Sequence, residues 1–321
     1  MKLFRHSRFL LLLSIMLASH ILHGQVTAGN NPFLADPTVF YHKGVYYLYG
    51  TGGENNRDSG FIVFTSTDKK KWQYGGFVLK KGESYGNKGF WAPQVFEYKG
   101  KFYMAYTANE HISIAEADSP LGPFTQKELK PLDTATRMID PFIFFDSGKI
   151  YLYHVRLQEG NRIFVAALND DLSAIQHATL KECINADLPW EDTQNAEWKV
   201  AEGPTALKHK GLYYLIYSAN DFRNPDYAIG YAVADNPVGP WKKYGANPIL
   251  SRKDIGTNGT GHGDVFMDGK GKMFYVFHLH NSNNKVSPRK TGMIEVKFKK
   301  EKGTPDKIVI KHGTFGLLNK K

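Results

Sequence analysis

A phrase that recurs five times along the chain constrains its fold more than any other sequence feature. Each copy has a glycine-containing turn followed by an aromatic-rich strand, as in segment 43–49, Lys-Gly-Val-Tyr-Tyr-Leu-Tyr. The turn glycines are residues 44, 100, 148, 211 and 271, so successive copies begin 56, 48, 63 and 60 residues apart. Repetition at such a period is typical of propellers and solenoids.

Short apolar runs flank each of these turns. One run precedes every turn, as in 38–40, and a further run follows the aromatic strand: residues 61–64, 111–114, 162–165, 228–231 and, in the last copy, 293–296. A strand, a glycine turn and a strand form a β-hairpin, which the further run extends. Five antiparallel sheets predict an all-β fold, a five-bladed β-propeller. A jelly roll or an immunoglobulin-like sandwich would not repeat five times at this period.

The N-terminus carries a different pattern. Lys2, Arg5 and Arg8 precede an apolar run at 9–18, which Ser14 interrupts. A charged segment followed by a short apolar one is the pattern of a secretory signal peptide, and this run is too short to span a bilayer. We therefore predict a signal peptide over 1–24, with cleavage as late as residue 28. Residues 29–321 would form a single catalytic propeller that is exported to the periplasm or the medium, without membrane insertion.

Charge and cysteine content exclude other classes of protein. The formal net charge is +10, but the leader holds three of the positive charges and a lysine-rich C-terminal segment holds many others. No nucleic-acid-binding motif accompanies this charge, so we predict a solvated surface and no nucleic-acid partner. The single cysteine, Cys183, excludes an intramolecular disulfide framework and a cysteine zinc cluster. We predict a monomer.

The repeat also carries the candidate chemistry. Asp36 and Asp140 stand eight residues before their turn glycines, and Trp91, Glu202 and His262 stand nine before theirs. The first strand of a propeller blade lines the central channel, so these side chains should meet at one funnel. Glycoside hydrolysis needs one carboxyl to protonate the leaving oxygen and another to activate water or attack carbon. Asp-Pro and Glu-Gly-Pro are also turn signals, but turns do not explain a ring of three acids, a histidine and a tryptophan.

At these residues the chain resembles glycoside hydrolase family 43, the five-bladed propeller glycosidases of arabinan and xylan breakdown. The similarity extends from about residue 30 to about residue 300, and its motifs are specific in their order and spacing. The matching stretches are 31–37, 46–51, Trp-Ala-Pro-Gln-Val at 91–95, Ile-Asp-Pro-Phe at 139–142, Ala-Glu-Gly-Pro at 201–204 and Gly-Thr-Gly-His at 259–262.

The resemblance implies hydrolysis with inversion and a role for each carboxylate. Asp36 would be the general base that activates water, and Glu202 the general acid that protonates the departing oxygen. Asp140 would orient the acid and raise its pKa. Two carboxylates ~6 Å apart repel by ~3 kcal/mol at an effective dielectric of ~20, which corresponds to about two pKa units. That repulsion suffices to keep Glu202 protonated near neutral pH while Asp36 stays ionised.

The resemblance implies further binding residues. Arg289 matches an arginine that contacts substrate near the base, and Trp91 is suited to stacking on a sugar ring. His262 matches a channel histidine that faces a buried water or a metal ion, commonly calcium, and the alternative is a histidine that only bonds channel water. Asn220 is a candidate for lining the pocket. No cofactor is required for the reaction itself.

The function predicted from these residues is an inverting hydrolase of pentose-containing plant oligosaccharides or polysaccharides. An α-L-arabinofuranosidase comes first, and a β-xylosidase, an arabinanase or a galactan- or galactofuranoside-active enzyme are alternatives. A non-catalytic carbohydrate-binding propeller and a protein-interaction propeller are alternatives from other classes. Linkage, exo or endo action and oligomeric state depend on loops that the repeat does not determine.

Overall fold

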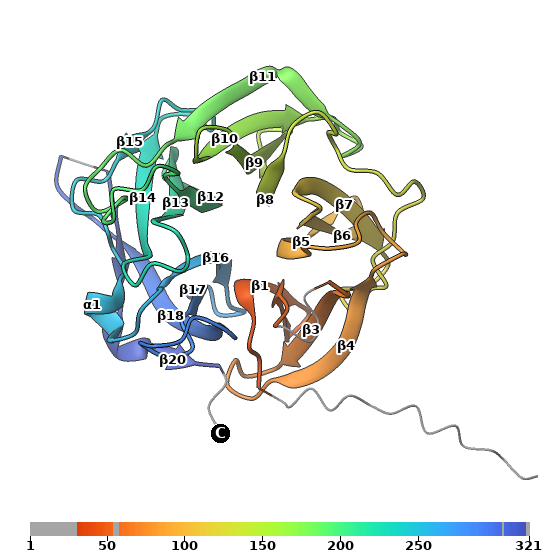
Figure 1. Ribbon diagram of the computed structural model, residues 1–321, viewed down its shortest axis with the longest axis horizontal. Helices are drawn as coiled ribbons and strands as arrows, with labels where there is room; N and C mark the ends of the chain where they lie inside the picture. The colour runs from red at the N-terminus through yellow and green to blue at the C-terminus, as the bar shows by residue number, and fades with distance from the viewer. Residues whose placement is uncertain (1–30, 54–57, 304, 319–321) are drawn as a thin grey trace, which may run out of the picture.

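A computed structural model describes residues 31–53, 58–303 and 305–318, and the predicted signal peptide lies outside them. The described chain forms five antiparallel sheets arranged in a ring (Figure 1), which confirms the five-bladed β-propeller. The strands, grouped by blade in chain order, are β1 (Ala35–His42), β2 (Val45–Thr51), β3 (Gly60–Ser66) and β4 (Gln73–Lys80); β5 (Trp91–Tyr98), β6 (Lys101–Ala108) and β7 (His111–Ala117); β8 (Met138–Asp146), β9 (Lys149–Leu157), β10 (Asn161–Leu168) and β11 (Ile175–Ile184); β12 (Ala201–His209), β13 (Leu212–Ala219), β14 (Ala228–Ala234) and β15 (Lys242–Lys243); β16 (Gly261–Met267), β17 (Met273–Leu279), β18 (Lys290–Lys299), β19 (Lys307–Ile310) and β20 (Gly316–Leu317).

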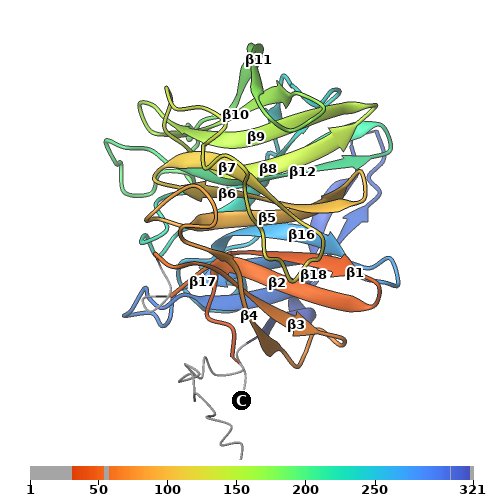
Figure 2. The same ribbon diagram turned by 90° about the vertical axis from the view of Figure 1, so that its right-hand side faces the viewer.

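The first strand of each blade lies nearest the centre of the ring, as β1, β5, β8, β12 and β16 show in Figure 1. Seen from the side, the strands run from one face of the disc to the other, roughly parallel to the viewing direction of Figure 1 (Figure 2). The two described helices are short: α1 (Arg252–Ile255) and the 3-10 turn η1 (His312–Thr314). Within the part of the chain that the structure describes, neither helix has the length or apolarity to cross a membrane.

Three strands per blade were predicted, and four blades have an outer strand in addition. These outer strands are β4, β11, β15 and β19. Strand β11 shows why the pattern missed them: most of its side chains are exposed or half-buried, because it lies at a sheet edge. An edge strand buries little apolar surface and therefore carries little hydrophobic periodicity.

Aromatic side chains from the repeated strands fill the spaces between blades. Tyr49 and Phe61 of the first blade pack with Met104 and Tyr106 of the second, and all four are fully buried. The two near-identical phrases at 119–124 and 236–241 also contribute to this packing. Tyr49 donates its hydroxyl hydrogen to the carbonyl oxygen of Pro120 at 2.6 Å, and the equivalent Tyr153 donates to Pro237. Each phrase thus anchors its own blade to a buried tyrosine of the preceding blade.

The ring closes where the first blade meets the fifth, and side chains join the two blades. Thr291 of β18 accepts a hydrogen bond from the amide of Leu34 at 3.1 Å and donates one to the carbonyl of Leu34 at 2.9 Å. Thr38 of β1 donates to Asp264 of β16 at 2.6 Å. An apolar cluster that includes Leu48 and Val276 packs at the same junction. These contacts hold β1 and β16 side by side at the channel.

Each first strand has an irregular position at the mouth of the channel. Asp36, Ala92, Asp140, Gly203 and His262 all have positive φ, between 38° and 60°. The pairing register of every first strand shifts at the same place. Such a φ is uncommon outside glycine and costs ~1–3 kcal/mol, so its recurrence at non-glycine residues marks a site rather than a simple turn.

This repeated bulge corrects one detail of the sequence prediction. Five equivalent ring positions were expected to carry Asp36, Trp91, Asp140, Glu202 and His262. The structure places Asp36, Asp140 and His262 at the left-handed position itself, whereas Trp91 and Glu202 each precede it by one residue. Because neighbouring residues of an extended strand point in different directions, the five side chains fall into two groups, three near the axis and two beside it.

Candidate active site

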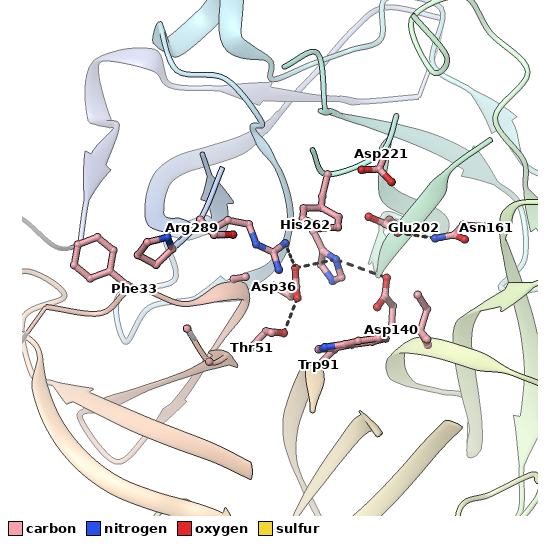
Figure 3. A pocket seen from close by; sticks show the side chains of 17 residues that line it. Phe33, Asp36, Thr51, Trp91, Asp140, Asn161, Glu202, Asp221, His262 and Arg289 are labelled. Carbon is pink, nitrogen blue, oxygen red and sulfur yellow. Dashed lines mark hydrogen bonds and ion pairs between the residues drawn. The ribbon is translucent and has the colours of Figure 1, made fainter. Parts of the chain in front are cut away.

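The predicted ring residues do line one cavity. It has a volume of about 300 Å³ and opens at the mouth of the channel (Figure 3). Its walls include the three acids and the three partners expected around them: Asp36, Asp140, Glu202, Trp91, His262 and Arg289. Its size falls at the lower end of the usual range for small-molecule pockets. Residues from all five blades therefore meet at one site.

A repeated hydrogen bond between blades supports the left-handed positions. The backbone N–H of each is held by a side chain of a neighbouring blade, and in four cases the acceptor stands seven residues after a turn glycine. The amide of Ala92 donates to Thr51 at 3.0 Å and that of Asp140 donates to Thr107 at 3.0 Å. The amides of His262 and Asp36 donate to Ser218 at 2.8 Å and to His278 at 3.1 Å, respectively. These acceptors offset part of the backbone strain.

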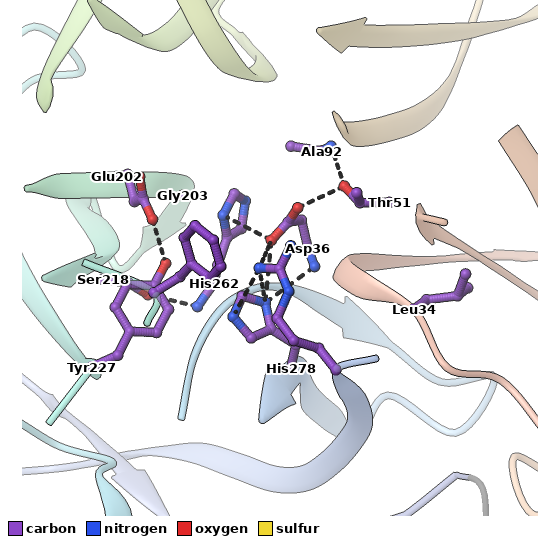
Figure 4. Close-up of polar contacts among 12 residues, drawn as sticks. Leu34, Asp36, Thr51, Ala92, Glu202, Gly203, Ser218, Tyr227, His262 and His278 are labelled. Atoms are coloured by element: carbon purple, nitrogen blue, oxygen red, sulfur yellow. Dashed lines mark hydrogen bonds and ion pairs between the residues drawn. The ribbon is translucent and has the colours of Figure 1, made fainter. Parts of the chain in front are cut away.

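Asp36 is held as an anion. Its Oδ1 lies 3.0 Å from a terminal nitrogen of Arg289, and its Oδ2 accepts a hydrogen bond from Thr51 at 2.6 Å (Figure 4). Burial alone would raise the pKa of this carboxyl, but the charge of Arg289 and the histidines His262 and His278 bring it well below its usual value. Asp36 is therefore ionised at neutral pH and can accept a proton from water.

Glu202 has the opposite electrostatic character. Burial raises its pKa to about 7, and the charges of Asp36 and Asp221 add to this effect. Two hydrogen bonds oppose the shift: Tyr227 donates to Oε1 and Asn161 donates to Oε2, both at 2.8 Å. Glu202 thus keeps its proton at slightly acid pH and is held in one orientation, as a general acid must be.

Asp140 stands between the other two acids in the ring. Its Oδ2 accepts the backbone N–H of Gly203 at 3.1 Å and lies 3.6 Å from Nδ1 of His262. Burial raises its pKa well above the usual value, and the charges of Glu202 and Asp36 raise it further. Two buried carboxyls that repel one another titrate as a pair. Asp140 and Glu202 accordingly favour states in which at least one of them carries a proton.

Gly203 allows the three acids to approach the axis. It has a φ of 60°, and a Cβ atom there would lie 2.8 Å from two ring carbons of His262. Any larger residue would therefore displace the imidazole, whose Nδ1 is 3.4 Å from Asp36. Burial lowers the pKa of His262, so the ring is neutral at neutral pH. The Glu-Gly-Pro phrase thus meets a steric requirement as well as forming a turn.

Aromatic and cationic side chains form the remaining walls. Trp91, the first residue of β5, lies on one side of the carboxylates, as predicted. Phe33 and Phe222 also line the cavity, and the guanidinium carbon of Arg289 lies 4.6 Å from the ring centroid of Phe222. Arg289 is thereby oriented by both a carboxylate and an aromatic face, geometries that suit its planar cation.

The structure places Asn220 differently from the prediction. Its side chain is buried and bonds neighbouring loop groups, with its amide donating to the carbonyls of Trp190 at 2.9 Å and Asp226 at 3.1 Å. Among the described residues, Asp221 and Phe222 line the cavity from this loop, and Asn220 does not. The side chain of Asn220 is needed to satisfy buried backbone groups, which leaves it unavailable to a substrate.

Four residues at the site were missed by sequence reasoning: Thr51, Asn161, Tyr227 and His278. His278 is fully buried against Asp36, and burial lowers its pKa to about 3. The sequence signal for Thr51 and His278 was a polar residue seven positions after a turn glycine. No repeat marks Asn161 or Tyr227, because they reach Glu202 from loops and strand ends that differ between blades.

The predicted calcium ion would lie in the channel near His262. Among the described residues, no group of three or more histidine, cysteine or acidic side chains is placed to hold a metal ion. The channel cavity beneath His262 has a volume of about 20 Å³, room for one or two waters. Calcium takes six to eight oxygen ligands, so an ion here would be coordinated mostly by water. A channel ion stays a prediction, and the function proposed below uses none.

Comparison with known proteins agrees with this geometry. A family model described as "Glycosyl hydrolases family 43" matches residues 30–305. A crystal structure titled endo-1,4-beta-xylanase, from Bacteroides thetaiotaomicron, is 42% identical, covers 89% of this chain and 96% of its own, and has a TM-score of 0.83. A curated beta-D-galactofuranosidase of Aspergillus niger is 25% identical over 86% of this chain and 83% of its own length. A beta-xylosidase of Xylanibacter ruminicola is 27% identical over 77% of this chain and 87% of its own length.

Proposed function

Because the chain belongs to glycosyl hydrolase family 43 and is a glycoside hydrolase, we propose that it cleaves pentosyl linkages of plant oligosaccharides or polysaccharides with inversion. Asp36 would be the general base, Glu202 the general acid and Asp140 the residue that positions the acid. The observation that carries this assignment is the division of protonation within one cavity. Arg289 keeps Asp36 ionised, while burial raises the pKa of Glu202 to about 7.

The reaction follows from these two protonation states. As the oxygen of a water molecule bonds to the anomeric carbon, that water gives a proton to Asp36. The bond to the leaving oxygen breaks, and that oxygen takes the proton of Glu202. One water is consumed, and the product has the opposite anomeric configuration, because a single displacement occurs on the face away from the leaving group.

We propose an α-L-arabinofuranoside as the first substrate to test and a β-D-xyloside as the second. The cavity of about 300 Å³ suits a single sugar ring against Trp91, but the ring residues do not discriminate between pentoses. The second candidate has specific support in the 42% identical structure, whose title describes a xylanase. Galactofuranosides form the third class of substrate to be tried.

A panel of p-nitrophenyl glycosides tests the substrate, and proton NMR of the first-formed sugar tests the stereochemistry. We expect release from the arabinofuranoside or the xyloside and an initial product with inverted configuration. Retention would contradict the role of Asp36 as a base toward water. Failure to cleave any of these glycosides or their oligosaccharides would contradict the pentoside assignment.

Replacing Tyr227 with phenylalanine should shift the alkaline limb of the pH–rate profile upward by about one unit. Activity requires protonated Glu202 and falls as pH rises through its pKa of about 7. The Tyr227 hydroxyl bonds the carboxylate and lowers that pKa, so its removal raises the pKa and extends the protonated form to higher pH. The measurement is kcat/KM against pH for both enzymes.

The matched control is Tyr213→Phe. The Tyr213 hydroxyl donates to Asp146 at 2.8 Å, in a contact between blades away from the cavity, so its loss should leave the profile in place. An alkaline limb that is unchanged in Tyr227→Phe, or moves downward, would show that Glu202 is not the acid that controls it.

Export of the protein also remains a proposal. The segment that carries the predicted signal peptide lies outside the described residues. Support comes from a relative in Cellvibrio japonicus whose name begins "Extracellular", although it is 23% identical and matches 57% of this chain. Detection of the enzyme in the periplasm or the medium, with residues 1–24 removed, would support the proposal.

A further inference from the structure

A second cavity adjoins Trp91, and none of the three carboxylates of the catalytic cavity lines it. Its volume is about 360 Å³, comparable with the catalytic cavity, and the two share Trp91 in their walls. Its other lining residues come from loops of the first two blades: Asp58, Lys88, Gly89, Asn109 and Glu110. Trp91 is only half-buried, so its ring is accessible to a bound molecule.

The wall between the two cavities is held in place by the loop before β5. Gly89 has a φ of 62°, and a Cβ atom there would lie 3.0 Å from Cζ2 of Trp91, so the backbone runs directly beside the indole. Asp58 accepts the N–H of Gly89 at 2.6 Å. Asn109 donates its own N–H to the carbonyl of Lys88 at 3.0 Å. The side-chain oxygen of Asn109 also accepts the N–H groups of Asn87 and Lys88 at 3.3 Å, so these bonds together hold the loop beside the indole.

The chemistry of the second cavity suits a sugar. The Lys88 ammonium and the Asn109 side-chain amide nitrogen have no hydrogen-bond partner among the described residues, so both are available as donors to hydroxyl groups. Glu110 offers a carboxylate that Arg137 already balances at 3.0 Å. Polar donors and acceptors beside an aromatic wall are the usual components of a saccharide site, since the ring faces of sugars are apolar and their edges are polar.

We propose that this second cavity binds a further sugar unit of the substrate that is cleaved next door, with Trp91 as the shared wall. The inference rests on the proposed function and deepens it, because it makes the enzyme one that favours oligosaccharides over substrates with a single sugar unit. A chain that reaches across Trp91 would gain contacts that an aryl glycoside cannot make.

The test measures kcat/KM for the p-nitrophenyl glycoside and for arabino- and xylo-oligosaccharides from the disaccharide to the hexasaccharide. We expect kcat/KM to rise about tenfold with chain length and then level off, from hydrogen bonds and aromatic contact at the second cavity. The double variant Lys88→Ala/Asn109→Asp removes both free donors and keeps the Oδ1 that accepts the N–H groups of Asn87 and Lys88 at 3.3 Å. It should lose most of this gain with length.

A matched control is Lys127→Ala/Asn195→Asp, which makes the same changes at exposed positions, with a positive φ of 56° at the asparagine. This control should keep the full gain with length. Equal kcat/KM for all lengths in the wild type would overturn the proposal. A gain that survives unchanged in Lys88→Ala/Asn109→Asp would also overturn it, because the extra unit would then bind elsewhere.

Binding measurements separate this inference from the proposed function. Isothermal titration of the Glu202→Gln variant, alone and combined with Lys88→Ala/Asn109→Asp, with the same oligosaccharides reports affinity with turnover suppressed. Affinity that rises with length and depends on Lys88 and Asn109 supports the second cavity even if none of these sugars is hydrolysed. Hydrolysis at rates that do not vary with the length of the oligosaccharide would leave the proposed function intact. It would overturn only the proposal that the second cavity binds a further sugar unit.

Discussion

Replacing Asp36 with asparagine should lower kcat by about 10³-fold on every substrate that the wild type cleaves. Asparagine keeps the size of the side chain but cannot take a proton from water. The loss should be similar for good and poor leaving groups, because water must be activated in the single displacement step whichever group departs. Initial rates on an aryl glycoside and on an oligosaccharide provide the measurement.

The surroundings of Asp36 explain why this substitution should be severe yet leave the fold intact. The amide oxygen of the asparagine can keep the contact with Arg289, and the Thr51 hydroxyl, which now donates to the other carboxylate oxygen, can turn to accept from the amide nitrogen. The backbone N–H of residue 36 still bonds His278. A melting temperature within a few degrees of the wild type, together with the loss of rate, would establish a chemical effect. Wild-type rates in a folded Asp36→Asn enzyme would remove Asp36 from the mechanism.

Replacing Glu202 with glutamine should produce a loss that depends on the leaving group. We expect about 10³-fold on oligosaccharides, whose leaving oxygen must be protonated, and a much smaller loss on p-nitrophenyl glycosides, whose leaving group departs as an anion. Glutamine also removes the group whose pKa of about 7 sets the alkaline limb, so that limb should disappear from the pH profile.

The comparison between the two variants is sharper than either alone. Asp36→Asn should slow both substrates alike, whereas Glu202→Gln should spare the activated one. A large and equal loss for both substrates in Glu202→Gln would indicate a role other than proton donation. In that case the cause would be sought in the hydrogen bond from Asn161, whose side-chain amide is oriented by the indole N–H of Trp198 at 2.8 Å. Glu202 accepts hydrogen bonds at both of its carboxylate oxygens, whereas a glutamine side chain can accept at only one end.

Most of the fold could be predicted because the repeat encodes local properties. A glycine turn between two apolar strands forms a hairpin wherever it occurs. The outer strands were not predicted, because a strand such as β11 is largely exposed and has little periodicity to recognise. The candidate site was predicted where it follows the repeat, as Asp36 and Asp140 do. It was missed where side chains enter from loops, as Tyr227 does.

The sequence by itself determined the five blades and the places where their first strands begin. Those features depend on turns and apolar runs within about 60 residues of one another. Only the tertiary structure decided which acid is ionised and which is protonated. Arg289, which sets the charge of Asp36, is 253 residues away in sequence and 3.0 Å away in space. A pKa depends on burial and on charges a few ångströms away, and the closing of the ring brings those charges together.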